Sequence, residues 1–330
     1  TVEILKQRPA GDKSWPIACS GTALGGADKE LDLSGAHLSY GDFKEAVFTG
    51  MGAIKLNGAG LAHTDLSGSN FSAVGGEAQT IDAIIDFRGA NLTNANLRAS
   101  RLTSKSSTKG NATIDFTEAD LAHADLSGST LTADSSYSGE AAIVFSGANL
   151  AHADLSGSKL TAEGFNSVGE ATIDFRDADL ARADLSGSIL SVENSYGGAT
   201  IDFRQANLAE ADLSGSVLMA EGSYGDATID FRGANLAYAD LSGSVLFASD
   251  GSSASIDFSE ANLTNADLSS STLTAGSTKG PATINFTNVN LDSSDFTGWK
   301  LTAVRKTGMP SPPPPPPPAP SKPPFPPGVA

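Results

Sequence analysis

Aspartate recurs at nearly regular intervals along the chain and is the residue type best suited to binding or chemistry. One series comprises Asp125, Asp154, Asp184, Asp212, Asp240, Asp267 and Asp295, and a second comprises Asp115, Asp174, Asp202, Asp230 and Asp257. Stacked carboxylates repel one another, and their oxygens suit Ca²⁺. The pattern predicts either a face that binds cations or a set of outward polar residues beside turns. The glycine-rich nonapeptide of dedicated calcium solenoids is absent.

Three of the four histidines share one position in a repeated unit. His63, His123 and His152 each follow a Leu-Ala pair, whereas His37 does not. This placement has two interpretations: a two-histidine metal site on the surface, or an ordinary row of surface rings. The sequence holds no Ser/His/Asp or Cys/His grouping suited to nucleophilic catalysis and no glycine-rich phosphate loop. We therefore expect no enzymatic activity and no cofactor.

Aromatic residues recur in the Gly- and Ser-rich segments between repeats. These residues are Tyr137, Phe165, Tyr196 and Tyr224. Aromatic rings with a polar handle suit binding surfaces, so the series predicts a strip that contacts carbohydrate or a partner chain. The alternative is that each ring packs over its own turn of the fold. The only two tryptophans, Trp15 and Trp299, fall near the two ends of the repeats, where they would either cover one molecule or contact the next.

The element that positions these residues is a five-residue unit. Residues 199–218 are four such units in a row, each closing on Phe or Leu, and nearly the same twenty residues return at 171–190 and 227–246. A period of five fits neither an α-helix nor a long strand. It predicts an all-β coil with four short sides, repeated about ten times. Closing residues, and the residue two before each, should point inward because strand side chains alternate.

Most turns also contain extra residues between the fourth side and the next first side. Examples are SVENSYGG before Ala199 and MAEGSYGD before Ala227. Their Gly and Ser content is typical of surface turns. The sequence therefore predicts a ridge of loops along one corner of the solenoid.

The units ANLAH, ADLSG and ADLAR resemble the pentapeptide-repeat family, whose unit is A(D/N)LXX. The resemblance covers about residues 31–302. It implies a right-handed quadrilateral β-helix with Leu and Phe inward. The chain departs from the family pattern by placing Ile-Asp-Phe on the first side and by inserting the loops. Members that imitate DNA have cleaner faces, so the ridge disfavours that function here.

The two ends lie outside the repeats. Residues 1–29 are predicted to form an N-terminal cap or assembly segment, with a short strand at 2–5, and residues 30–304 the solenoid. Residues 305–330 form a proline-rich tail of polyproline II type. The tail resembles hydroxyproline-rich glycoproteins, which implies hydroxylation and O-glycosylation of Pro312, Pro313, Pro314, Pro315, Pro316, Pro317 and Pro318. Asn111, in a loop, is the best placed of five N-glycosylation sequons.

Composition excludes some classes of function. The chain of 330 residues has a formal charge of −17, with 38 acidic against 21 Lys and Arg residues. A binder of nucleic-acid phosphates needs a basic face, so we expect no nucleic-acid partner. One cysteine allows no internal disulfide, and no stretch is long and apolar enough to span a bilayer.

Two hypotheses follow. The first is an extracellular or cell-surface structural protein that stacks end to end into a fibre or coat, with the tail contacting a neighbour and glycans attached. The second is an acidic binding module that recognises a protein or carbohydrate, including mimicry of DNA toward a DNA-binding enzyme. Identical rungs and aromatic ends favour the first hypothesis, because a contact that does not close gives a filament.

Overall fold

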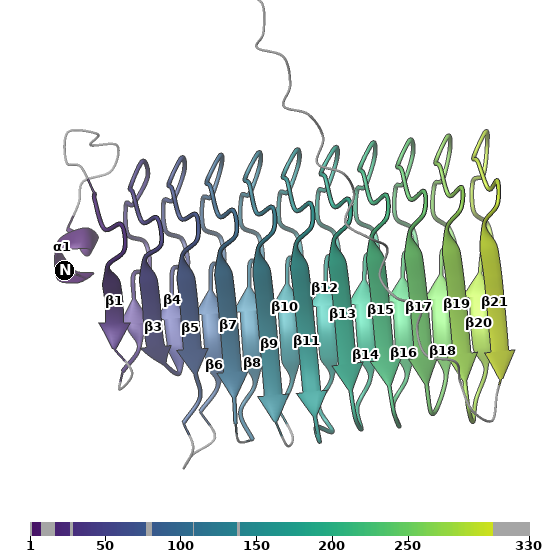
Figure 1. Cartoon of the computed structure of the whole chain (residues 1–330), viewed down its shortest axis with the longest axis horizontal. Coiled ribbons are helices and arrows are strands. Elements are labelled where there is room, and N and C mark those ends of the chain that lie inside the picture. The colour runs from purple at the N-terminus through teal and green to yellow at the C-terminus, as the bar shows by residue number, and fades with distance from the viewer. Residues whose placement is uncertain are drawn as a thin grey trace, which may run out of the picture.

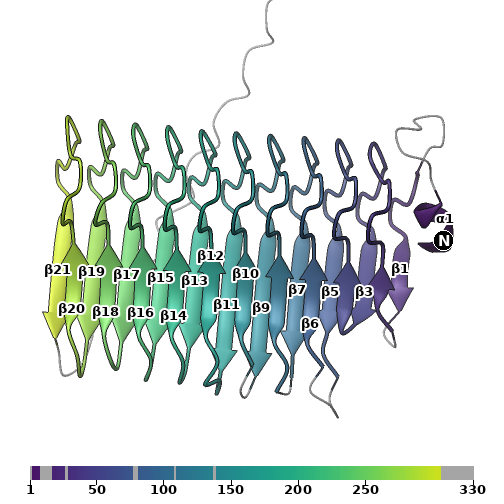
Figure 2. The same ribbon diagram turned by 180° about the vertical axis from the view of Figure 1, so that it is seen from behind.

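The computed structural model describes residues 2–7, 17–26, 29–76, 81–107, 109–136 and 139–305. Over this part of the chain the fold is a β-solenoid of about ten turns built on two parallel sheets (Figure 1). Figure 2 shows the second sheet from behind, with its strands stacked in chain order. The predicted all-β solenoid is therefore confirmed. Its right hand stays a prediction.

The larger sheet holds the strands of the fourth side. It has eleven strands, which are β1 (Ala23–Gly26), β3 (Val47–Met51), β5 (Asn70–Val74), β7 (Arg101–Ser106), β9 (Thr130–Ser136), β11 (Lys159–Phe165), β13 (Ile189–Asn194), β15 (Val217–Gly222), β17 (Val245–Asp250), β19 (Thr272–Ser277) and β21 (Lys300–Arg305). Most of these strands run three or four residues past the closing Leu. Much of each predicted loop is therefore strand, and the remaining connection is short, as at residues 195–198.

The second sheet holds the strands of the first side. It has ten strands, which are β2 (Leu31–Asp32), β4 (Ala53–Lys55), β6 (Ala83–Asp86), β8 (Ala112–Asp115), β10 (Ala141–Val144), β12 (Ala171–Asp174), β14 (Ala199–Asp202), β16 (Ala227–Asp230), β18 (Ala254–Asp257) and β20 (Ala282–Asn285). Each strand pairs in parallel with its equivalent one coil away, as in Ile173 opposite Ile201. The other two sides are rows of single parallel bridges, such as Asp154 with Asp184. The coil therefore has four sides.

Three of the four corners of each coil are tight turns with one residue in the left-handed region. At one corner the N–H of Ser216 donates to the carbonyl of Leu213 at 3.1 Å, and Gly215 has φ of 61°. Glycine takes this conformation without steric cost. At another corner the same conformation falls on Glu210 and Tyr238, with φ of 58° and 61°. Hydrogen bonds between coils stabilise this conformation in residues that carry a side chain. For example, the backbone N–H of Glu210 donates to the carbonyl of Ala237 in the next coil.

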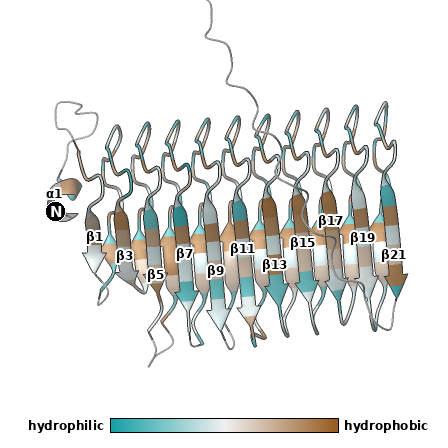
Figure 3. Ribbon diagram, in the orientation of Figure 1, coloured by the Kyte–Doolittle hydropathy of each residue, from teal (hydrophilic) through white to brown (hydrophobic). Residues whose placement is uncertain are grey.

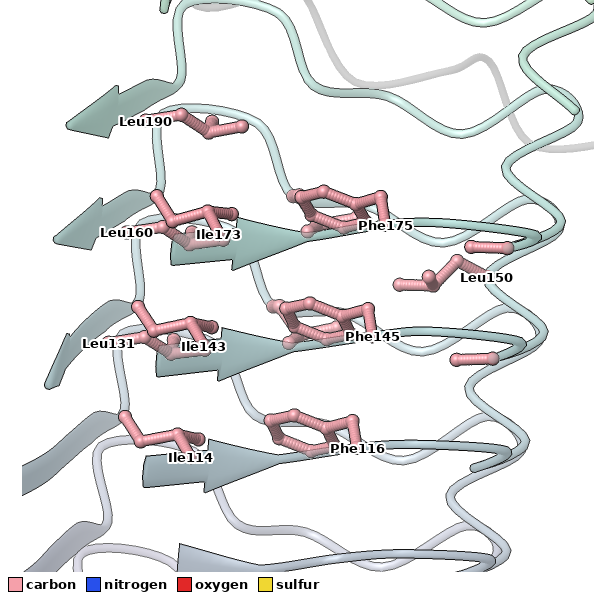
Figure 4. Close-up of a cluster of buried hydrophobic side chains, with 14 of the residues drawn as sticks. Ile114, Phe116, Leu131, Ile143, Phe145, Leu150, Leu160, Ile173, Phe175 and Leu190 are labelled. Atoms are coloured by element: carbon pink, nitrogen blue, oxygen red, sulfur yellow. The ribbon is translucent and has the colours of Figure 1, made fainter. Parts of the chain in front are cut away.

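The interior is a set of side-chain columns that run along the solenoid. Figure 4 shows three successive rungs of Ile, Phe and Leu from the two sheets. The rings of Phe175 and Phe203 lie parallel with centroids 4.9 Å apart, and both are fully buried. The residue two before each closing residue is also buried, as in Ala206, Ala211 and Ser216. The predicted inward columns are confirmed.

The two ends of the solenoid differ. Helix α1 (Val2–Lys6) lies beside β1 at the N-terminal end (Figures 1 and 2). The predicted strand at 2–5 is therefore wrong. Glu3 in the first turn and Lys6 in the last suit the helix dipole, and the helix places buried Leu5 against the first coil. Lys6 also forms an ion pair of 2.9 Å with Asp32.

Candidate functional site

The regular aspartate series of the third side caps turns. The Oδ1 atom of Asp184 accepts the backbone N–H of Ser186 at 2.9 Å, and Asp154 accepts that of Ser156 at the same distance. Such local bonds are the ordinary role of Asp beside a turn. Among the residues that the structure describes, no group of three or more His, Cys, Asp or Glu side chains is arranged to hold a metal ion. The geometry favours the structural interpretation of this series.

Aspartates on the first side form a ladder with arginine that the sequence analysis missed. Asp202 accepts from Arg204 at both carboxylate oxygens, with Nη2 to Oδ2 at 2.6 Å. Arg176, one coil earlier, lies 3.6 Å from the same carboxylate. The pattern repeats with Asp174 and Asp230. The signal was present in the sequence as Ile-Asp-Phe-Arg at 173–176, 201–204 and 229–232.

This ladder places opposite charges on one face instead of an uncompensated acidic strip. The Asp202 carboxylate is only 5% exposed, whereas Arg204 is 40% exposed. The hydrogen bond and charge of Asp174 raise the pKa of Arg176 further above its ordinary value. A shallow groove of about 450 Å³ lies along this row, lined by Arg176, Asp177, Arg204, Gln205, Arg232, Ser259 and Glu260. Because each arginine is bonded to carboxylate, the face offers little free positive charge.

The histidine series lies on one corner, as its spacing predicted. The rings of His123 and His152 stack with centroids 4.8 Å apart, and His63 stacks on Tyr40 at 4.9 Å. The column continues to Arg182, which forms a 2.9 Å ion pair with Glu210. The corner is therefore a row of stacked rings and charges between coils.

An acidic row crosses the outer face of the larger sheet. Glu163, Glu193 and Glu221 are direct neighbours on β11, β13 and β15. Burial, followed by the charge of Glu193, raises the pKa of both Glu163 and Glu221. The sequence analysis missed this row because it assigned these residues to loops. Their constant position, three after the closing Leu, was the available signal.

The exposed aromatics adjoin this acidic row. Phe165, Tyr196 and Tyr224 are 65%, 50% and 58% exposed. The rings of Tyr196 and Tyr224 stack at 5.3 Å, and Lys279 lies 5.1 Å from the centre of the Tyr224 ring. A groove of about 150 Å³ is lined by Glu163, Gly164, Phe165, Glu193, Asn194, Ser195, Glu221 and Ser223. These three rings do not pack into the coil, and together with the glutamates they form a mixed aromatic and acidic surface. Tyr137 lies outside the described residues.

Trp299 lies in the last coil. Its ring contacts Phe286 at 5.9 Å and Phe296 at 4.7 Å between centroids. Leu291 and Leu301 in the same coil are 41% and 47% exposed, whereas the equivalent leucines of the preceding coil are fully buried. The C-terminal end of the solenoid therefore exposes apolar side chains whose equivalents in the preceding coil are buried. Trp15 lies outside the described residues.

The predicted modification sites are only partly within the described residues. Asn111 precedes β8, where its Oδ1 atom accepts the backbone N–H of Glu140 at 2.9 Å. Its glycosylation stays a prediction. Pro312 to Pro318 lie outside the described residues. In the described part of the chain, no helix has the length and apolarity needed to cross a membrane.

Comparison with known proteins supports the repeat architecture. The family described as pentapeptide repeats matches in eight copies, with residues 85–104, 114–132 and 143–162 matched. No curated protein matches significantly. Among solved structures, HetL, a pentapeptide repeat protein involved in heterocyst differentiation regulation from the cyanobacterium Nostoc sp., is 22% identical. That alignment covers 88% of this chain and 91% of HetL with a TM-score of 0.22.

Two further solved structures also align with this chain at low sequence identity. Full-length QnrB1, a plasmid-mediated fluoroquinolone resistance protein, is 16% identical over 87% of this chain and 93% of its own, with a TM-score of 0.19. A pentapeptide repeat protein of the Arabidopsis thaliana thylakoid lumen is 21% identical over 45% of this chain and 65% of its own, with a TM-score of 0.12. Because these TM-scores are low, the assignment to a family rests on the matched repeats and the four-sided coil and not on the solved structures. The eight matched repeats, and the four-sided coil that such units build, place the chain in the pentapeptide-repeat family as a solenoid of about ten turns.

Proposed function

We propose that this protein is a non-catalytic assembly element that pairs with a second copy through its C-terminal end. The observation that carries the proposal is the exposed apolar rung of the last coil. Leu291 and Leu301 are 41% and 47% exposed, and Trp299 packs beside them on Phe286 and Phe296. Sheet edges with apolar side chains are templates for pairing with another chain.

The two ends favour a closed pair over a continuous fibre. A head-to-tail fibre needs two open ends, whereas helix α1 covers the N-terminal coil with buried Leu5. The N–H of Ser34, with help from Lys6, lowers the pKa of Asp32 to about 2, so the carboxylate that pairs with Lys6 of α1 stays ionised from neutral pH into mild acid. Contact between two identical C-terminal ends closes on itself. A fibre or coat would require α1 to move aside.

Length in solution tests this proposal directly. Eleven stacked strands at about 4.8 Å give a rod of roughly 50 Å. An end-to-end pair should therefore show a maximum dimension near ~100 Å in the rod direction by small-angle X-ray scattering. A particle of single-rod length at high concentration would reject the pairing.

A second candidate is recognition of a basic partner or a carbohydrate through the acidic and aromatic surface. The in-register row of Glu163, Glu193 and Glu221 beside exposed Tyr196 and Tyr224 favours it. Mimicry of DNA is less well supported, because Arg176, Arg204 and Arg232 compensate the aspartates of the first side. A supercoiling assay with a DNA topoisomerase distinguishes mimicry of DNA from recognition of another partner. Lack of inhibition removes mimicry and leaves the aromatic surface as the candidate.

The extracellular or cell-surface setting is part of the proposal. The sequon at Asn111 and the prolines from Pro312 to Pro318 support it. Mass spectrometry of the protein from its native source should find hydroxyproline in the tail, with attached pentose or hexose. Unmodified prolines together with an unmodified Asn111 would argue against this setting.

A further inference from the structure

The outer face of the larger sheet changes character at three neighbouring strands. At the position after the closing residue, β7, β9, β11 and β19 carry threonine. At the same position β15 and β17 carry Met219 and Phe247. The position before the closing residue is likewise apolar in β13, β15 and β17, with Ile189, Val217 and Val245. In Figure 3 these three strands begin in brown, whereas β5, β7 and β11 begin in teal.

We call these five residues the apolar patch: Ile189, Val217, Met219, Val245 and Phe247. Their side chains point away from the interior, because they alternate with buried Leu218 and Leu246. Yet Phe247 is only 3% exposed and Val217 only 8% exposed. Ser191, beside the patch on β13, is 4% exposed.

Thr161 on β11, paired with Ser191, is also only 3% exposed, but farther from the patch the equivalent side chains are more open. Thr103, Thr132 and Thr274 occupy the position of Ser191 and Phe247 and are half-buried. The described elements that contact β15 are its sheet neighbours β13 and β17 and the strands β14 and β16 of the other sheet. None of these lies over the outer face. An outward side chain on one face of a sheet becomes this buried only when another segment covers it.

The tail is the segment that has the required reach. Arg305 ends β21 and is level with Asp250 on β17, three residues beyond Phe247. Phe247 is thus about 10 Å across the sheet and about 10 Å back along the strand. Residues 306–310 span up to ~17 Å when extended, which bridges that diagonal. By contrast, residues 8–16 are attached near β1, six strands and roughly 29 Å from β13.

The tail also has the complementary chemistry. Residues 310–318 are proline apart from Ser311, which favours a preformed polyproline II helix of about 28 Å. Such helices dock on aromatic and apolar surfaces at low entropic cost. Residues 306–330 contain Lys306 and Lys322 and no Asp or Glu. The acidic row of Glu163, Glu193 and Glu221 borders the patch on the same face.

We propose that the proline run 310–318 docks on the apolar patch of its own solenoid, crossing β17, β15 and β13. The tail is then an intramolecular strap over one face instead of a free linker. This inference is independent of pairing at the C-terminal coil, because it concerns the side of the rod and not its end.

Cysteine labelling tests the strap in the full-length chain. Ser191→Cys is nearly isosteric and places a thiol beside the patch, whereas Ser72→Cys places one at the equivalent outward position of β5. The only native cysteine, Cys19, is buried, so it gives little background. The same two variants are then made in a chain whose residues 310–320 are replaced by a Gly/Ser sequence of equal length. Circular dichroism checks that both chains keep the β-solenoid.

We expect Ser191→Cys to react with a maleimide about tenfold more slowly than Ser72→Cys in the native chain, because labelling requires the strap to open. Replacing the prolines should raise the Ser191→Cys rate about tenfold and leave Ser72→Cys unchanged. Equal rates with and without the prolines would overturn the proposal. Protection that grows with protein concentration would also overturn it, because the tail would then cover a neighbouring molecule.

Discussion

At the scale of single residues, several serines of the fourth side are buried with hydroxyl groups that have no hydrogen-bond partner. Ser188, Ser216 and Ser244 are at most 1% exposed. Within the described structure their Oγ atoms make no hydrogen bond. A buried hydroxyl without a partner carries a desolvation cost.

Replacing one of these serines should therefore stabilise the fold. We expect Ser216→Ala to raise the free energy of unfolding by about 1 kcal/mol, since it removes the unsatisfied hydroxyl at almost constant volume. Ser214→Ala is the matched control. Its Oγ donates to Asp212 at 2.6 Å, so its loss should lower stability by roughly 0.5–1 kcal/mol. Urea unfolding followed by circular dichroism distinguishes the two signs, and a loss in both variants would contradict this account.

Much of the interior was predictable residue by residue. The five-residue period identifies closing residues such as Phe203 and Leu218, and strand alternation identifies inner partners such as Ile201 and Ala206. The ladder of Asp202 and Arg204 was harder to foresee. Its aspartates were interpreted, like the turn-capping ones, as an outward row of acids, and the arginine two residues on was not considered.

At the scale of elements, the main difference from prediction is the length of the fourth side. Beyond Leu218 the chain continues as strand to Gly222, with buried Ala220 pointing inward. The sequence analysis assigned these residues to a loop because they fall outside the five-residue unit. Pairing with the same segment one coil away supplies the backbone hydrogen bonds that favour strand, even with Gly and Ser present. The missed extension is what carries the acidic row.

The acidic row makes stability depend on pH. Burial and the charge of Glu193 raise the pKa of Glu163 and Glu221 above the ordinary value of 4.5. A raised carboxyl pKa means that the folded state holds protons more tightly than the unfolded state. The resulting stabilisation is present below the ordinary pKa and is lost as pH rises through the folded-state pKa. We expect the unfolding midpoint to fall as pH rises from 4.5 toward neutrality.

Neutralising the central residue should weaken that dependence. Glu193→Gln removes the charge that acts on both Glu163 and Glu221. We therefore expect the stability to depend less steeply on pH, and the free energy of unfolding at neutral pH to rise by about 0.5 kcal/mol. Glu210→Gln is the control. The hydrogen bond from Arg182 lowers the pKa of Glu210, so its titration falls below the window and the slope should persist. Thermal unfolding monitored at several pH values measures both, and an unchanged slope in Glu193→Gln would refute the assignment to this row.

At the scale of the whole molecule, the two ends set what the rod can do. The five-residue period and the columns of inward side chains are local properties of the chain, so the sequence predicted the stack of coils well. The two ends were less predictable. Whether a helix covers the N-terminal coil, and whether the C-terminal coil stays open, depends on contacts between distant segments. The described structure has α1 on the first coil and exposed Leu291 and Leu301 on the last. This asymmetry favours a pair over an endless fibre.

The most direct test of this account is the molar mass in solution, measured by light scattering after size exclusion. The chain has a mass of 33.5 kDa, and we expect the native protein to approach twice that value as concentration rises. Leu301→Glu places a charge on the exposed end and should return the mass to that of one chain. Tyr238→Glu, on a corner residue that is 63% exposed, should leave the pair intact. A native protein that stays at one chain at every concentration, or a pair that survives Leu301→Glu, would contradict assembly through the C-terminal end.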